Sequence, residues 1–525
     1  MREMHRMALL VRCRGVRLSV LASAAAWVAV GGVAHAQSVP GAGQLPGAES
    51  GLGTPATGSG QVQPVTPPPA PEGNSQDVIG DIVVTATRRE TRVQTTPIAI
   101  TAVDGEAMNR LGIQRPDDLA KFVPGLTVPG PTFNGIAAPT IRGIGFLSAL
   151  SSISQPVAFY VDGQFMDRPY GVYAKLFDVD RVEVLRGPQG VLFGRNATAG
   201  AIRIEHALPT TELAVLGRVS YSSFNTFEAQ GSLRGPVTDT LSLGIAGDFS
   251  SSDGFGRNVF NGDDIFGYDV RGVRGSLVWR PSDAARLVVR GGHVYEMSTV
   301  GYKNIFSFPT QRDAIFNDPA LRPNQVNNNF PGFNKRISND VTAEFSYRFP
   351  DLTLTALGGY NNYRYRARTD YDGSGARGGE NDYRASYEGY SGELRASSTS
   401  LGRARIDVGL YYLHEEPAGD GSALRIFAPN GVRVAGYDGS QELSTTDAYA
   451  AFGHVAFDAT DRLTLRAGVR YSIEEKRYQV LARIFAPTIP GGSFIATVDN
   501  SLTSHAVTPL FGLDYKIDHG IFLYA

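Results

Sequence analysis

The sequence predicts an antiparallel β-barrel that spans a membrane, preceded by a small α+β domain. Three observations support this prediction. Residues 211–525 repeatedly alternate apolar and polar side chains with a period of two, as strands with two different faces do. The connections between these segments alternate between short and long. Beyond the N-terminus, no apolar run reaches the roughly 18 residues that a membrane-spanning helix needs.

Residues 1–36 have the organisation of a secretory signal peptide. Five arginines precede or border the apolar stretch Leu18–Val33, and Ala34–Ala36 gives an A-x-A cleavage site, so we expect Gln37 to begin the mature chain. The single cysteine, Cys13, lies inside this segment, so we expect no disulfide and no thiolate metal site in the exported protein. The mature chain keeps 44 basic and 50 acidic residues, and a net charge of about −6 disfavours a nucleic-acid partner.

Residues 37–76 are dominated by Gly, Pro, Ala, Ser and Thr and contain too few large apolar groups to form a core, which predicts a disordered tether. The β-branched segment 81–87, DIVVTAT, follows it. This segment is either the first strand of the next domain or an extended segment that adds itself to the sheet of another protein. About five backbone hydrogen bonds at roughly 1 kcal/mol each would make such docking reversible.

Residues 88–210 predict the α+β domain. A strand is expected at 97–103, a helix at 104–111 capped by the Asp104 side chain, and a second helix at 117–122. The segment 157–163 ends in Asp-Gly, which suits a tight hairpin turn.

The segment 181–204, RVEVLRGPQGVLFGRNATAGAIRI, is the centre of this domain. Its glycines and Pro188 predict a short strand, a tightly folded turn and a second strand. A phosphate-binding loop is excluded, because Arg195 and Asn196 follow Gly194 where such a loop needs Lys and Ser or Thr. An ordinary turn in a soluble domain remains the alternative.

The elements VPGL, IRG, VDG and LRGPQG occur in this order between residues 123 and 190. In this they resemble the plug domain of TonB-dependent outer-membrane receptors, although the last strand reads Ile202–Arg203–Ile204 where the family has Ile-Asn-Ile. The resemblance implies that the plug sits inside the barrel lumen. The residues that carry the plug signature are Gly143, Asp162, Gly163, Glu183, Gly187, Pro188, Gly190, Gly194 and Gly200.

The resemblance also implies that residues 81–87 are a TonB box, the segment that docks on the inner-membrane-anchored energy transducer. The residues expected to contact TonB are Asp81, Ile82, Val83, Val84, Thr85 and Ala86.

The alternating segments after residue 211 fit either a soluble sheet packed on a core or a barrel that faces lipid, and the loop lengths decide between them. We expect short turns at 235–240, 281–285, 349–351, 399–403, 458–462 and 517–520, and long loops at 251–268, 297–339, 366–382, 415–446 and 474–504. Short turns at one end and long loops at the other are typical of outer-membrane barrels. About 13 strands are present, whereas the family closes with 22, so the C-terminal strands are expected to be missing.

The function implied by the resemblance is TonB-dependent active transport of a scarce ligand across the Gram-negative outer membrane, with a ferric siderophore favoured. A non-iron ligand (cobalamin, a glycan or an aromatic compound) and a passive gated porin are the alternatives. The expected partners are TonB with its motor proteins, outer-membrane lipid and a small-molecule ligand, with the protein a monomer. No enzyme activity or catalytic residue is expected, because the motifs contain no grouping of a nucleophile, a base and an orienting residue. No cofactor or metal site is expected, since the six histidines of the mature chain have no ligand-like spacing.

A plug that blocks a lumen must be held there and must also move. Arg142 and Arg186 of the plug are predicted to form ion pairs with Glu344 and Glu393 of the barrel wall, although solvated charges in a wet lumen are an equal alternative. The loops 129–135 and 146–155 are predicted to contact the ligand.

Overall fold

A computed structural model of the chain describes most of the mature protein after residue 90. The described residues are 83–84, 89, 91–128, 139–145, 154–166, 175–301, 321–398, 401–428, 431–485, 492–517 and 521–525. The predicted signal peptide and tether, four of the TonB-box residues (Asp81, Ile82, Thr85 and Ala86) and most of the predicted ligand loops lie outside these residues. Within the described part, no helix has the length and apolar character to cross a membrane.

The α+β domain, here called the plug (the described residues between 83 and 206), is built on a five-stranded sheet. Its strands, in sheet order, are β3 (Ile100–Asp104), β8 (Val179–Arg186), β9 (Gly200–His206), β6 (Val157–Val161) and β7 (Gln164–Met166). Only the β6–β9 pair is parallel. The plug core is apolar, because strand residues such as Phe159, Val182 and Ile202 are almost fully buried.

The helices of the plug are short. Helix α2 (Gly105–Leu111) begins where predicted, because the Asp104 carboxylate accepts a hydrogen bond from the backbone N–H of Ala107 at 2.7 Å. Gly112, with φ of 67°, ends it. The predicted second helix is the 3₁₀ helix η2 (Pro116–Lys121). The remaining plug elements are η1 (Val93–Thr95), α4 (Gly190–Phe193), and the two-residue strands β1 (Val83–Val84), β2 (Thr91–Arg92), β4 (Leu126–Thr127) and β5 (Thr140–Ile141).

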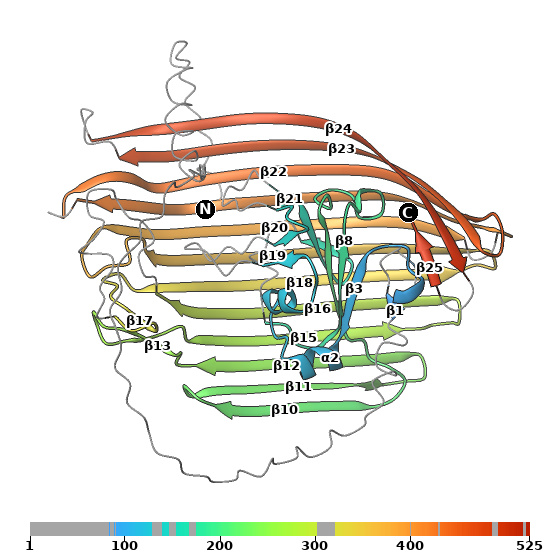
Figure 1. Cartoon of the computed structure of the whole chain (residues 1–525), viewed down its shortest axis with the longest axis horizontal. Coiled ribbons are helices and arrows are strands. Elements are labelled where there is room, and N and C mark those ends of the chain that lie inside the picture. Colours follow the sequence, from blue (N-terminus) through green and yellow to red (C-terminus); the bar gives the residue numbers. More distant parts are fainter. Residues whose placement is uncertain are drawn as a thin grey trace, which may run out of the picture. The chain divides into compact units, whose positions relative to one another are not determined.

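The rest of the described chain forms a 13-stranded antiparallel sheet, here called the wall, whose strands pair in sequence order (Figure 1). This confirms the predicted strand number. The strands are β10 (Ala214–Ser222), β11 (Thr226–Pro236), β12 (Leu241–Ser252), β15 (Tyr268–Trp279), β16 (Ala285–Val300), β18 (Gly332–Arg348), β19 (Leu352–Asp370), β20 (Gly379–Ser398), β21 (Ala404–Phe427), β22 (Arg433–Asp458), β23 (Leu463–Phe485), β24 (Ser493–Ile517) and β25 (Ile521–Tyr524).

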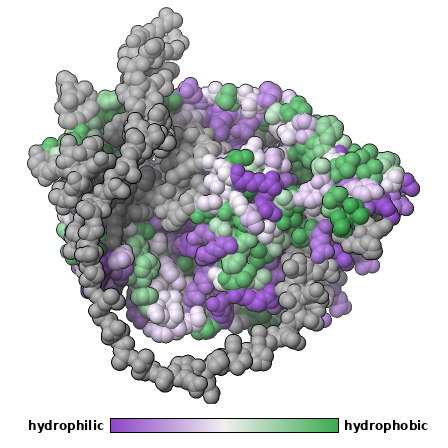
Figure 2. All heavy atoms as spheres, viewed as in Figure 1, coloured by the Kyte–Doolittle hydropathy of each residue, from purple (hydrophilic) through white to green (hydrophobic). Residues whose placement is uncertain are grey.

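The wall has its polar face on the buried side and its apolar face exposed. Along β12, Leu243, Ile245 and Phe249 are exposed, whereas Asp248 and Ser250 are buried. This is the reverse of a water-soluble sheet and fits a wall that faces lipid. The face seen in Figure 2 also carries apolar patches between hydrophilic ones.

The predicted short turns at 235–240, 281–285, 349–351 and 458–462 lie between consecutive strands as expected, but two of the long loops were predicted wrongly. Strands β21 and β22 run through most of the predicted loop 415–446, and β23 and β24 run through most of 474–504, so that only short connections remain. About 9–11 residues suffice to cross a membrane, and these strands have 23 to 26. In their outer parts, polar and apolar residues no longer alternate regularly, so the pattern that marks a lipid-facing strand disappears although the backbone ladder continues.

The predicted long loop 251–268 contains structure of its own. Strands β13 (Gly256–Asn258) and β14 (Asp264–Ile265) pair there, and β17 (Gln325–Val326) of the β16–β18 connection joins β13 in parallel. The buried side chain of Asn258 fastens the two loops, because it exchanges hydrogen bonds with the backbone N–H and C=O of Asn328.

Candidate functional site: the contact between plug and wall

Charged side chains of the plug meet charged side chains of the wall. Lys175 shows the pattern: its Nζ lies 2.7 Å from Oε1 of Glu228 on β11, 3.8 Å from Oδ1 of Asp248 on β12, and donates to Oγ of Ser250 at 2.7 Å. All four side chains are buried. Since an isolated buried ammonium or carboxylate is costly, each of these groups is stable here only in the presence of the others.

Asp162, which the sequence identifies as part of the plug signature, is the centre of a second cluster. Its carboxylate lies 2.9 Å from Nδ1 of His206 and accepts the backbone N–H of His206 at 2.8 Å, both within the plug. Arg274 of β15 donates to it at 3.3 Å, and Arg290 of β16 lies 3.6 Å away. Burial alone would raise the pKa of Asp162, but His206, Arg290 and Arg274 hold this pKa below its usual range.

Glu205 of β9 lies beside this cluster. It accepts from Arg203 at 2.7 Å and lies 3.9 Å from Arg290. Burial raises the pKa of Glu205, and the neighbouring Asp162 adds to that effect. Arg290 therefore bridges two plug carboxylates from the wall side.

Arg195, which follows α4, connects the plug to β21 and β23 of the wall. Its Nη1 donates to Glu415 of β21 at 2.6 Å, and its Nη2 lies 3.4 Å from Glu474 of β23. Apolar side chains of α4 and β6, Leu192, Phe193 and Tyr160 among them, pack with Leu413 and Ala448 of the wall next to these ion pairs. This side of the plug is thus held by ion pairs and by apolar packing.

Three further contacts complete the set in the described part of the chain. Arg115 lies 3.2 Å from Glu296 of β16, which also pairs with Arg336 of β18. Asp178 pairs with Arg234 of β11. Arg89 donates to the carboxylate of Asp407 on β21 at 3.0 Å and to the carbonyl of Ser398 at 2.9 Å.

Several signature glycines lie where the plug backbone approaches a neighbour most closely. A Cβ on Gly194 (φ 80°) would lie 2.7 Å from Nη2 of Arg470 on β23, and one on Gly190 would lie 3.0 Å from Thr508 on β24. A Cβ on Gly163 (φ 84°) would lie 3.0 Å from Leu357 on β19. At these positions an added side chain would press on side chains of the wall, and the positive φ of Gly194 and Gly163 would add backbone strain.

The other signature residues act inside the plug. Gly143 and Gly187 have positive φ, Gly187 leads into Pro188, and Gly200 packs against Leu185. Glu183 is fully buried and accepts from Arg203 at 2.8 Å and from Arg181 at 2.9 Å.

The structure brings plug and wall charges together, but not by the pairing that we predicted from the sequence. Arg186 donates to the carbonyl of Pro124 in the plug at 3.3 Å, and Arg142 is exposed beside Gly125. Glu393 is buried and pairs with Arg395 of its own strand at 2.9 Å, while Glu344 is half-buried on β18. The prediction was therefore wrong about the pairing of Arg186 with Glu393.

Two residues of the predicted TonB box are described. Val83 and Val84 form β1, which pairs antiparallel with Thr91 and Arg92. The Val84 side chain is fully buried in the apolar cluster that includes Ala158 and Leu185. In this arrangement Val83 and Val84 pair within the chain itself, and the assignment of a TonB box stays a prediction.

A group of tyrosines on the buried face of the wall was not predicted from the sequence. Tyr363 of β19 stacks on Tyr387 of β20 with ring centroids 5.4 Å apart, and Tyr365 and Tyr383 adjoin them. They follow Asn361, whose side chain donates to the plug carbonyl of Phe165 at 3.4 Å. The alternation with a period of two could have revealed this group, because Tyr363, Tyr365 and Tyr387 all occupy inward-facing positions.

Two protein-family models match the chain. The TonB-dependent receptor plug domain matches residues 92–201, and the β-barrel of TonB-dependent receptor-like proteins matches residues 279–525. Together they cover the plug and most of the wall.

Among curated proteins, the pesticin receptor of Yersinia pestis is 24% identical over 408 residues, which are 77% of this chain and 57% of that receptor. The chain thus spans a little over half the length of this relative. The crystal structure of the ferric yersiniabactin uptake receptor from Y. pestis superimposes with a TM-score of 0.66 at 20% identity, over 81% of this chain and 63% of that one. The ferripyoverdine receptor of Pseudomonas aeruginosa gives 0.64 at 18% identity, over 83% and 57%.

Proposed function

Since this chain belongs to the TonB-dependent receptors of the Gram-negative outer membrane, we propose that it takes up an iron chelate, a ferric siderophore, with energy that TonB supplies. One observation carries the energetic part of the proposal. The plug is fastened to the wall by at least six separate charged contacts, centred on Lys175, Asp162, Arg195, Arg115, Asp178 and Arg89.

Passage of a ligand would require these contacts to break. Removal of one partner from a buried pair costs roughly 3–5 kcal/mol, so loss of several pairs at once is far beyond thermal energy. A passive porin would not need a domain that such contacts hold inside its lumen. Work applied to the N-terminal side of the plug, at the predicted TonB box, would supply what is needed.

The choice of ligand rests on the relatives and on the tyrosine group. The relatives bind pesticin, ferric yersiniabactin and ferripyoverdine, as their names state. The tyrosine group (Tyr363, Tyr365, Tyr383 and Tyr387) has flat, amphipathic rings of the kind that bind a bulky chelate, but Tyr363, Tyr365 and Tyr387 are buried in this arrangement and would have to be uncovered before they could contact one. The iron would be cargo held by the chelator, so no metal ligand from this chain is required.

Uptake of ⁵⁵Fe-siderophores by a deletion strain that carries the chain tests the proposal. We expect energised uptake of at least one ferric siderophore, and its loss in Val83→Pro, which removes a backbone donor from the predicted TonB box. Ala56→Pro, in the predicted tether, is the matched control and should leave uptake unchanged. Siderophore binding to whole cells should survive Val83→Pro.

Two results would contradict the proposal. Uptake that persists when the proton motive force is abolished would favour the passive porin. Growth on cobalamin, a glycan or an aromatic carbon source that depends on the chain, without any siderophore uptake, would favour the non-iron ligand.

A further inference from the structure

A cavity of about 590 Å³ lies between helix α2 of the plug and strands β10, β11 and β12 of the wall. Ser232 and Ala246, which lie opposite each other in the register of β11 and β12, line it on the wall side, and Met108 of α2 lines it on the plug side. The cavity exists because Ser232 and Ala246 are too small to fill the space in front of α2. Its volume is within the range of about 300–1,000 Å³ that small-molecule sites have.

Two of the ion pairs between plug and wall lie at opposite ends of this cavity. Arg234, which pairs with Asp178, lies close to the short-turn end of β11. Glu228, which pairs with Lys175, lies farther along the same strand. Since the short turns of outer-membrane barrels face the periplasm, Asp178 lies at the periplasmic end of the cavity and Lys175 at its outer end.

The linking segment, residues 175–180, joins these two ion pairs and leads into β8, and its residues 176–180 line the cavity. Phe177 anchors the middle of the segment, because its ring is buried beside Val270 of β15, and a Cβ on Gly272 would lie 2.6 Å from the ring. Asp178 has a φ of 59°, a conformation that costs energy in a residue other than glycine and is common in switch segments. The linking segment is thus a strained piece of chain held to the wall at three points.

The plug and the wall are in close contact on the side of α4. Leu192 and Phe193 of α4 pack with apolar side chains of the wall, and a Cβ on Gly190 would already lie 3.0 Å from Thr508 of β24. A ligand that passed on this side would have to displace the packing around α4. Beside α2, it would have to displace only the linking segment.

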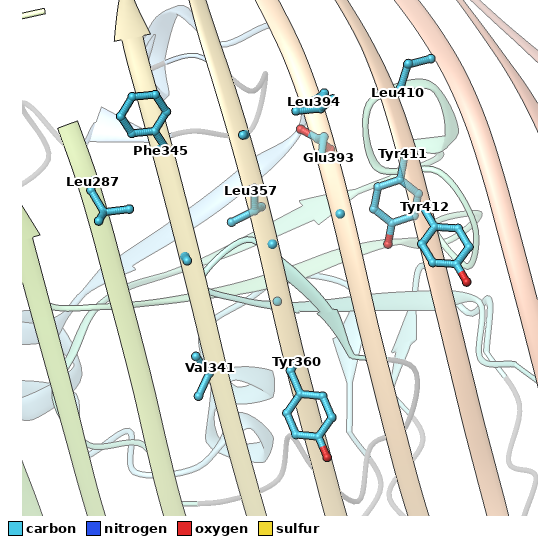
Figure 3. A pocket seen from close by; sticks show the side chains of 15 residues that line it. Leu287, Val341, Phe345, Leu357, Tyr360, Glu393, Leu394, Leu410, Tyr411 and Tyr412 are labelled. Carbon is cyan, nitrogen blue, oxygen red and sulfur yellow. The ribbon is translucent and has the colours of Figure 1, made fainter. Parts of the chain in front are cut away.

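The wall also carries a groove of about 690 Å³, which lies on its outer surface. The sides of this groove include Phe345 of β18, Leu394 of β20 and Leu410 of β21 (Figure 3). These side chains are exposed on the lipid-facing side of the wall, away from the plug. The cavity beside α2 is therefore the better placed of the two for a ligand that leaves the lumen.

We propose that the linking segment is a local gate, and that the transported ligand leaves the lumen through the cavity beside α2 while α4 stays in contact with the wall. This route rests on the proposed uptake of an iron chelate. If the opening is confined to this side, only two of the six charged contacts, those of Lys175 and Asp178, need to break for the ligand to pass.

Cross-linking of the plug to the wall tests this route, because the only cysteine of the chain, Cys13, lies in the predicted signal peptide. In cells that take up a ferric siderophore through the chain, Phe177→Cys/Gly272→Cys is treated with a short bis-methanethiosulfonate reagent, which ties the linking segment to β15. We expect loss of ⁵⁵Fe-siderophore uptake, with siderophore binding to the cells retained. Reduction of the cross-link should restore uptake, which separates the effect of the tether from a folding defect.

The matched control ties the other side of the plug. In Gly190→Cys/Thr508→Cys the two Cβ atoms would lie 3.9 Å apart, a separation that suits a disulfide, so the same reagent holds α4 on β24. Uptake should be unchanged in this variant. Loss of uptake with both tethers would overturn the local gate, since the whole plug would then have to move. Uptake that continues while the linking segment is tied would also overturn it.

A measurement that needs neither ligand nor TonB separates this proposal from the proposed function. Ser232 lines the cavity, whereas Ala448 lies in the apolar contact with α4. In isolated outer-membrane fragments, a water-soluble maleimide should modify Ser232→Cys at least about tenfold faster than Ala448→Cys, because only the first thiol meets water. Equal rates would overturn the proposal, because the cavity would then be closed to water. Failure of the proposed function would show instead as absence of siderophore uptake by the unmutated chain, with these labelling rates unaltered.

Discussion

Substitution of Lys175 by Met should loosen the plug without altering its core. The side chain is buried and of similar length to Met, and its ammonium group faces Glu228 and Asp248 of the wall. With Lys175→Met, two buried carboxylates would face each other without a cation.

The distances set the magnitude. At 2.7 Å and 3.8 Å from the ammonium, and with an effective dielectric constant of about 20, the attractions are about 6 and 4 kcal/mol, most of which offsets the burial of three charges. Removing one partner from a buried pair costs roughly 3–5 kcal/mol. Glu228 keeps a hydrogen bond from Ser220 at 3.3 Å, so we expect the lower end, about 3 kcal/mol.

Hydrogen exchange of the protein in nanodiscs measures this effect. Amides of β8 and β9, near the site in the plug, should exchange about 100-fold faster in Lys175→Met, as about 3 kcal/mol implies. Lys121→Met is the control, because Lys121 is exposed and pairs only with Asp118 on the same 3₁₀ helix, so its loss should change exchange less than about threefold. Exchange of β8 that is equal in both variants would refute the view that charged contacts hold the plug.

Two other predictions concern a glycine and a carboxyl group. Gly200→Ala should destabilise the plug by more than about 2 kcal/mol, because its Cβ would lie 2.1 Å from the carbonyl oxygen of Leu185, whereas Gly275→Ala should be nearly neutral in the same thermal unfolding measurement. Burial, with help from a neighbouring aspartate, raises the pKa of Asp370 at the outer end of β19 to about 8, and its carboxyl accepts the backbone N–H of Phe330 in the connection before β18. Because the folded pKa lies above the unfolded value, the folded arrangement around Asp370 should be most stable below about pH 4 and should lose that stability as the pH rises from about 4 through about 8. Loop exchange corrected for its intrinsic pH dependence should show this, and Asp370→Asn should abolish it.

The wall was predicted well from the sequence because the signals that identify its strands and turns come from residues close together in the chain. A period of two identifies each strand and its two faces, and the turn residues identify the short connections, so the order of all 13 strands follows. The plug signature was equally informative, because residues such as Gly200 are constrained by neighbours in the same domain. The outer strand extensions were missed because polar and apolar residues do not alternate regularly there.

The partners between plug and wall could not be predicted in this way. The alternation shows that Glu228, Asp248 and Glu296 point inward, but the rotation of the plug inside the wall decides which cation each one meets. That rotation depends on contacts among many strands at once. Arg186 was assigned to the wall because it lies in the signature turn, yet its nearest acceptor is Pro124 of the plug itself.

The chemistry of the plug–wall contact bears on how a blocked lumen can be opened and closed repeatedly. If the contact were apolar throughout, movement of the plug would expose that surface to water at about 25 cal/mol for each Å², and the cost would persist for as long as the lumen stayed open. Charged side chains behave differently, because water replaces their partners once the lumen is wet, and exposed pairs are worth only about 0–1 kcal/mol. The ion pairs around Lys175 and Asp162 are therefore costly to break while dry and cheap to keep apart once hydrated. Such a contact resists slow leakage yet gives way to a brief pull, and it reforms when water leaves.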